Sequence, residues 1–142
     1  MKEVRLSVRA DTQSIAQIGR FAEAFMREAQ ISGDDIARFL IALEELVSNL
    51  VKYGYPDEAS RGSVTVTLRL TGDRLRVALV DDGRPFDPFA QPAPDLEAPL
   101  DARPVGGLGL HLVNTMMEET DYHREDDRNV TAFGRRVRLA GT

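Results

Sequence analysis

The 142-residue sequence has no cysteine and only two histidines, His111 and His123. The lack of cysteine excludes disulfides, thiolate zinc sites and cysteine nucleophiles, and two histidines are too few for a histidine-based metal cage. The sequence also has no apolar run of roughly 18 residues and no cationic start leading into an apolar stretch, so neither a membrane span nor a signal peptide is predicted. We therefore expect a cytoplasmic protein that does not associate with a membrane.

The sequence also has fewer basic than acidic residues. Lysine and arginine together number 18 against 23 aspartates and glutamates, which gives a formal net charge of −5. Because general nucleic-acid binding requires a surplus of Lys and Arg, direct binding of nucleic acid is not expected. The arginines at 135, 136 and 138 are interpreted as the charged side of a last strand. With 42% apolar residues, the chain is long enough to bury a core, and residues 1–142 are predicted to form a single domain.

The spacing of apolar residues predicts both strands and helices. Alternation predicts a strand over 3–9, a hairpin over 64–79 with its glycine turn at 71–73, and a last strand pair that turns at 126–129. Helical spacing predicts one helix after a cap at Asp11 or Thr12 and a second helix over 35–53. These periodicities indicate the two layers of an α/β sandwich.

The helix predicted over 35–53 carries the most informative polar residues. Glu45, Asn49 and Lys52 fall within about 60° of each other, opposite the apolar stripe that includes Leu43 and Val47. The plain interpretation is that they form the solvated side of a surface helix, since charged residues are mostly exposed. Ile41 lies on the same side, and an apolar residue there indicates that something covers this face, although single exposed apolar residues are common.

Asp81 ends the strand predicted over 75–81. Counting by two, it points to the same side as the apolar residues Leu75, Val77 and Leu79, so the row that faces the core ends in a carboxylate. A buried carboxylate requires donors, and the amine of a ligand is one candidate. The alternative is a turn in which Asp81 accepts hydrogen bonds from the amides of Asp82 and Gly83.

The region between the two sets of strands has no periodicity, and six of the seven prolines lie between 82 and 106. Such a long connection predicts a lid or binding loop at about 86–106, with a disordered insertion as the alternative. It leads into the glycines of the segment 105–110, which begins a helix. Amides in the first helical turn bind anions, so this segment is a candidate phosphate site, although glycines before a helix also form plain turns.

Three motifs together resemble a known family. The segment from Glu45 to Tyr53 is similar to the asparagine box of the ATPase superfamily that includes gyrase, the heat-shock chaperone of ninety kilodaltons and histidine kinases. Asp81-Asp82-Gly83 resembles its first glycine box, and Gly107-Leu108-Gly109-Leu110 resembles its second. The surrounding segments 81–88 and 106–110 are most similar to anti-sigma regulatory factors with serine-protein kinase activity. The resemblance covers nearly the whole chain and implies a mixed, mostly antiparallel sheet packed against three helices, with an ATP lid.

The resemblance also implies a role for each motif. Asp81 would accept the adenine amino group, Gly83 would let the backbone pass close to the base, and Asn49 would hold Mg²⁺ through its amide oxygen. Glu45 would be the general base that takes the proton from an attacking hydroxyl, or would only position water or magnesium. The remaining residues expected to contact ATP are Lys52, Pro85, Arg103, Gly106, Gly107, Leu108, Gly109, Leu110 and Thr131, the last through water.

Two positions depart from the family pattern. Tyr53 stands where the antagonist-directed kinases often have histidine, and Val105 stands where they have arginine, a role for which Arg103 is near enough to substitute. Pro85, in contrast, replaces the second glycine of the first box and fits the anti-sigma subset better than histidine kinases. His111 is interpreted as an exposed helical residue rather than a catalyst.

The function implied is phosphorylation of a serine on an anti-sigma factor antagonist of the STAS type. Phosphorylating the antagonist would release this protein to capture a sigma factor, and the resemblance suggests a homodimer. Two alternatives stay open. One is a nucleotide-gated partner-binding module that binds ATP without transferring phosphate, because binding and catalysis share every residue except Glu45. The other is the catalytic domain of a split histidine kinase that acts on a separate protein.

Overall fold

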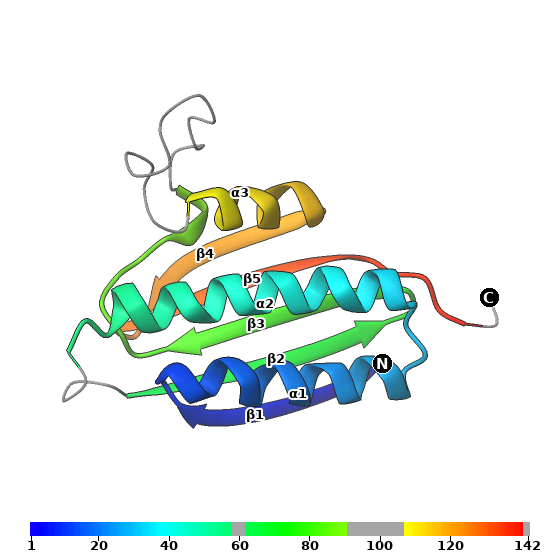
Figure 1. The fold of residues 1–142 in the computed structure, drawn as a ribbon, viewed down its shortest axis with the longest axis horizontal. Coiled ribbons are helices and arrows are strands. Elements are labelled where there is room, and N and C mark those ends of the chain that lie inside the picture. Colours follow the sequence, from blue (N-terminus) through cyan, green and yellow to red (C-terminus); the bar gives the residue numbers. More distant parts are fainter. Residues whose placement is uncertain (58–61, 91–106, 141–142) are drawn as a thin grey trace.

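A computed structural model describes residues 1–57, 62–90 and 107–140. The strands are β1 (Lys2–Arg9), β2 (Ser63–Thr71), β3 (Arg74–Asp81), β4 (Glu119–Glu125) and β5 (Arg128–Arg136). The helices are α1 (Thr12–Glu28), α2 (Gly33–Gly54) and α3 (Gly107–Met116), with a short 3-10 turn, η2 (Pro88–Ala90). Figure 1 shows the three helices on one face of the sheet, which confirms the predicted two-layer sandwich.

The five strands are ordered β1-β2-β3-β5-β4. Every pairing between neighbouring strands is antiparallel, so the mixed component of the predicted sheet is absent from the described part of the chain. The hairpin of β2 and β3 turns at Gly72 and Asp73, and the hairpin of β4 and β5 turns at Asp126 and Asp127, as predicted. Because β5 lies beside β3 and runs antiparallel to it, the start of the last strand meets Asp81: residue 81 pairs with residue 129.

Helices α1 and α2 begin where the sequence supplies caps. The Asp11 carboxylate accepts hydrogen bonds from the amides of Gln13 and Ser14, and the Ser32 hydroxyl accepts one from the amide of Asp35. Both caps satisfy amides that a helix leaves unpaired in its first turn. The apolar faces of α1 and α2 then pack on the sheet, where Phe39 of α2 stacks on Phe133 of β5 at 5.9 Å between ring centroids. None of the helices in the described residues combines the length and apolar character needed to cross a membrane.

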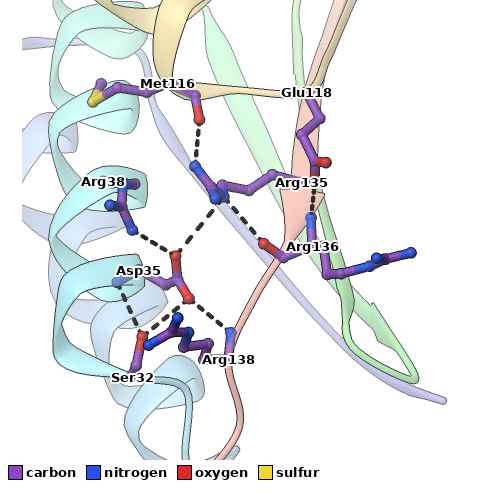
Figure 2. A network of polar contacts seen from close by, with 8 residues as sticks. All are labelled: Ser32, Asp35, Arg38, Met116, Glu118, Arg135, Arg136 and Arg138. Carbon is purple, nitrogen blue, oxygen red and sulfur yellow. Dashed lines mark hydrogen bonds and ion pairs between the residues drawn. The ribbon is translucent and has the colours of Figure 1, made fainter.

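A polar cluster fixes the start of α2 to the end of the sheet (Figure 2). Asp35, buried on α2, accepts hydrogen bonds from the Ser32 hydroxyl at 3.0 Å, from an Arg38 guanidinium nitrogen at 2.9 Å and from the backbone amide of Arg138 at 2.7 Å. The Arg135 guanidinium lies 3.8 Å from the same carboxylate and donates to the carbonyl of Met116 at the end of α3. The interpretation of the three arginines as a simple charged side is therefore wrong for Arg135, which joins α2, α3 and β5.

Replacing Asp35 by asparagine is expected to lower the free energy of unfolding by about 2 kcal/mol at pH 7, because hydrogen bonds to a charged group are lost. Burial raises the pKa of the Asp35 carboxyl. The opposing influences together outweigh burial, so the net shift is downward; they are the hydrogen bonds from the Arg138 amide, Ser32 and Arg38 and the charge of Arg135. A lowered pKa means that this stabilisation is complete above the unfolded pKa of about 3.9 and is lost as the pH falls through the folded pKa.

Urea unfolding of the wild type and of Asp35→Asn between pH 7 and pH 3 measures the difference in their free energies of unfolding. The matched control is Asp34→Asn, since Asp34 lies in the same helical turn but is exposed. A control variant that loses as much stability as Asp35→Asn would show that the helix dipole, not the cluster, is responsible.

Candidate functional site

A recess lies between the second half of α2, the end of β3, the start of β5, and the segment that follows β3. Its lining residues are Leu46, Leu50, Gly54, Leu79, Asp81, Phe86, Pro88, Asn129 and Thr131. The space left inside it is about 10 Å³, which is room for no more than one water molecule. The recess as it stands is therefore too small for a purine.

The Asp81 carboxylate lies at the bottom of the recess, 2% exposed. Its Oδ2 atom accepts hydrogen bonds from the Gly83 amide at 3.0 Å and from Asn129 Nδ2 at 3.1 Å. The Gly83 bond fits the turn interpretation, but Asp82 donates no such bond in the described residues. Oδ1 likewise receives no hydrogen bond from any residue that the structure describes. A buried acceptor without a donor is unfavourable, so Oδ1 is a position where a ligand donor would be stabilised.

The charge of Asp81 depends on these few donors. Burial raises the pKa of the Asp81 carboxyl, and the negative charge of Asp82 raises it as well. The hydrogen bonds from Asn129 and Gly83 and the positive charge of Arg124 act in the opposite direction, but the net shift is upward. Burial therefore has the largest influence on the pKa of this carboxyl, and its hydrogen-bond donors offset only part of that influence.

Gly83 packs tightly between Asp81 and the end of α2. A Cβ atom at Gly83 would lie 2.9 Å from Asp81 Oδ2 and 2.9 Å from the carbonyl oxygen of Gly54. The next residue, Arg84, donates its amide to that same carbonyl at 3.0 Å. The predicted first glycine box thus joins the end of α2 to the recess, and only glycine fits at position 83.

Glu45 and Asn49 form a joined pair on α2. Asn49 Nδ2 donates to the backbone carbonyl of Glu45 at 2.6 Å and to Glu45 Oε1 at 2.9 Å. Asn49 is 5% exposed, so the solvated-face interpretation is wrong for it, because α3 packs over this side of α2. Its Oδ1 atom accepts no hydrogen bond from the described residues, and an amide oxygen in that state suits a hard cation such as Mg²⁺.

The second glycine box lies directly against Glu45. Residues 107–110 are the first four residues of α3, and a Cβ atom at Gly109 would lie 2.0 Å from the Glu45 carboxylate carbon. Leu110 is buried in the core, so its side chain anchors α3 rather than lining the recess. The structure brings the two predicted motifs together, with the helix start beside the predicted general base.

Other predicted site residues lie farther from the recess. Lys52 is exposed, and its Nζ atom lies 5.5 Å from the centroid of the Tyr53 ring. Tyr53 in turn stacks on Phe86 at 5.0 Å, so it helps to hold the segment that closes the recess. Pro85 is exposed, and Pro88 takes the place on the recess wall. Ile41 is 49% exposed, so it is not itself covered as its position suggested.

Some predictions fall partly or wholly outside the described residues. Arg103, Gly106 and Val105 are not described, nor is most of the predicted lid over 86–106. For Gly107 and Leu108 only the backbone is described, as the start of α3.

Asn129 is the site residue that the sequence did not reveal. It is 3% exposed, lines the recess and donates to Asp81. A polar residue in a strand of alternating pattern is a weak signal by itself. Its importance follows from the pairing of β5 with β3, two strands that are separated by α3 and β4 in the sequence.

Comparisons with known proteins agree with this arrangement. Residues 8–135 match the family model of the histidine kinase-like ATPase domain. The serine-protein kinase RsbW of Staphylococcus epidermidis is 32% identical over 128 residues, which cover 87% of this chain and 79% of that protein. RsbW of Bacillus cereus (strain ATCC 10987 / NRS 248) is 25% identical over 138 residues, covering 91% of this chain and 82% of that protein.

Solved structures share the fold. The crystal structure of the RsbU and RsbW domains of Rv1364c from Mycobacterium tuberculosis superposes with a TM-score of 0.69 at 18% identity. The match covers 96% of this chain but only 33% of that one. The histidine kinase AdeS of Acinetobacter baumannii gives a TM-score of 0.52 at 12% identity, over 92% of this chain and 67% of that one. At these identities the likeness concerns the fold alone.

Proposed function

This chain belongs to the histidine kinase-like ATPase family, and on that premise we propose that it binds magnesium-ATP in the recess and transfers the γ-phosphoryl group to a serine of a protein partner. The observation that carries the proposal is the buried Asp81 carboxylate, whose Oδ1 atom has no donor among the described residues. A 6-amino group supplies such a donor. Thr131 lines the same recess and would reach the base through water.

The phosphates would lie between α2 and the start of α3. Backbone amides of Gly107, Leu108 and Gly109 in the first turn of α3 would hold them, together with Gly106. Mg²⁺ would bind the Oδ1 atom of Asn49, with phosphate oxygens and water as its other ligands. Lys52 and Arg103 would supply positive charge to the phosphates, and Pro85 would shape the segment above the base.

Glu45 is proposed as the general base. It would take the proton of the attacking serine hydroxyl while the serine oxygen bonds to the γ-phosphorus and the bond from phosphorus to the leaving ADP oxygen breaks. Its carboxylate lies beside Gly109 at the start of α3 and accepts a hydrogen bond from Asn49. The residues proposed as base and metal ligand therefore lie beside the helix proposed to hold the phosphates, which supports the proposed transfer.

The partner is proposed from the relatives. RsbW proteins are named serine-protein kinases, and the identity of 25–32% over most of this chain supports a protein serine as the acceptor. We propose that the acceptor is an anti-sigma factor antagonist of the STAS type in the cytoplasm. Its phosphorylation would free this protein, acting as one domain and as a homodimer, to capture a sigma factor.

Magnesium-ATP at about a hundredfold its dissociation constant is expected to raise the free energy of unfolding by roughly 2.7 kcal/mol, because only the native state binds it. Asn49→Ala or Asp81→Ala should remove this gain, since each loses one end of the nucleotide site. Denaturant unfolding with and without magnesium-ATP measures it, and Asn114→Ala, an exposed position on α3, is the matched control. Wild-type stability that is indifferent to magnesium-ATP would overturn the nucleotide assignment.

A further inference from the structure

We propose that Asn129 is a positioning residue that fixes the Asp81 carboxylate so that the recess accepts 6-aminopurine nucleotides and rejects 6-oxopurine nucleotides. This inference rests on the proposed ATP binding and assigns the choice of base to a second residue. Asn129 does not need to touch the base for this role, because it acts through Asp81.

Asn129 is the centre of the polar contacts beneath the recess. Its Nδ2 group donates to Asp81 Oδ2 at 3.1 Å and to the carbonyl of Arg84 at 2.8 Å. Its Oδ1 atom accepts from the Arg124 guanidinium at 3.1 Å, from the Phe86 amide at 3.4 Å and from the Tyr122 hydroxyl. The side chain thus links β4 and β5 to the segment after β3.

These contacts determine which way the amide points. Every neighbour on the Oδ1 side is a donor, and both neighbours on the Nδ2 side are acceptors. The reversed amide would place its NH₂ group against the Phe86 amide and the Arg124 guanidinium, which can only donate, and its oxygen against a carboxylate and a carbonyl. Asn129 can therefore present only a donor to Asp81.

A fixed donor on Oδ2 has a consequence for Oδ1. The Gly83 amide donates to Oδ2 as well, so both of the hydrogen bonds that the described residues make to the carboxylate are on one oxygen. The other oxygen keeps its full acceptor capacity inside a buried recess. A 6-amino group would donate to it, whereas a 6-oxo group would bring a second acceptor against a negative charge.

The donors also favour the ionised form of the carboxylate over the neutral form. Burial raises the pKa of Asp81, and the Asn129 hydrogen bond is the largest of the influences that lower it. A protonated Asp81 could donate to a 6-oxo group and would no longer exclude it. Loss of Asn129 should therefore weaken the choice of base as well as ATP affinity, which loss of a purely structural residue would not do.

The experiment compares dissociation constants of magnesium-ATP and magnesium-ITP by calorimetry, since inosine differs from adenosine in carrying a 6-oxo group. Wild type should prefer ATP by about 100-fold. Asn129→Ala should reduce this preference to about tenfold or less. Tyr122→Phe is the matched control: it removes a neighbour of Asn129 Oδ1 but keeps both Nδ2 donations, so the preference should persist.

If Asn129→Ala does not fold, Asn129→Asp serves in its place, because it keeps the shape and the acceptor side. Two adjacent carboxylates share a proton, so the preference should again fall. Equal weakening of ATP and ITP in a folded variant would overturn the proposal and show that Asn129 only supports the fold. A wild-type protein that binds ATP and ITP equally would overturn the proposal for Asn129 but would leave the proposed ATP binding intact. Wild type that binds neither would overturn the proposed function and this inference together.

Discussion

Glu45→Gln is expected to lower the rate of serine phosphorylation by about 10²- to 10⁴-fold, the range lost when a general base is removed. Magnesium-ATP binding should persist. The reason lies in the hydrogen bond from Asn49 Nδ2 to Glu45 Oε1, because a glutamine keeps an oxygen at that position. The variant therefore removes the basic carboxylate without releasing the amide that orients the proposed magnesium ligand.

Glu45→Ala provides a second comparison. It removes both the base and the acceptor, so Asn49 keeps only its bond to the Glu45 backbone carbonyl. Loss of phosphotransfer in both variants, with weaker magnesium-ATP binding in the alanine variant alone, would separate the two roles of Glu45. If the glutamine variant transfers phosphate at the wild-type rate, Glu45 is a positioning residue and not the base.

The measurement is transfer of labelled γ-phosphate to a STAS-type antagonist recovered with the protein. The matched control is Glu44→Gln, because Glu44 is the exposed neighbour of Glu45 on α2 and should leave the rate unchanged. A wild-type protein that binds magnesium-ATP but labels no natural partner would instead favour the nucleotide-gated binding module.

The sequence predicted the elements of the fold well because its periodic signals are local. Alternation in β1, β2 and β3 and the cap at Asp11 each depend on a few neighbouring residues. The same holds for Asp81, whose burial follows from its place on the same face of β3 as Leu75, Val77 and Leu79.

Contacts between distant segments could not be predicted in the same way. The helical wheel places Asn49 opposite the main apolar stripe, but α3 packs on that side, and the one local sign of it, Ile41, is itself exposed. The role of Asn129 depends on β5 pairing with β3, and that of Arg135 depends on reaching both Asp35 and the end of α3. Such contacts arise from the packing of whole elements, so the pattern of residues within one element does not predict them.

The second large effect on phosphotransfer is expected for Gly109→Ala, because Gly109 of α3 lies against Glu45. An added Cβ would lie 2.0 Å from the Glu45 carboxylate carbon and 2.3 Å from each carboxylate oxygen, so this side chain must move. The displaced atoms belong to the end of a flexible side chain, and the cost to folding is small. Alanine also favours a helix over glycine by about 0.8–1.0 kcal/mol, which offsets that cost.

Gly109→Ala should therefore fold with nearly wild-type stability while its phosphotransfer rate falls by about 10²-fold or more, because the proposed base is displaced from its position. Thermal unfolding and labelled phosphate transfer measure the two effects separately. Gly19→Ala is the matched control, since an added Cβ on α1 meets no atom within 4 Å. It should gain the helical stabilisation and keep the full rate. A Gly109→Ala protein that transfers phosphate as fast as this control would show that the approach of α3 to Glu45 is not needed for catalysis.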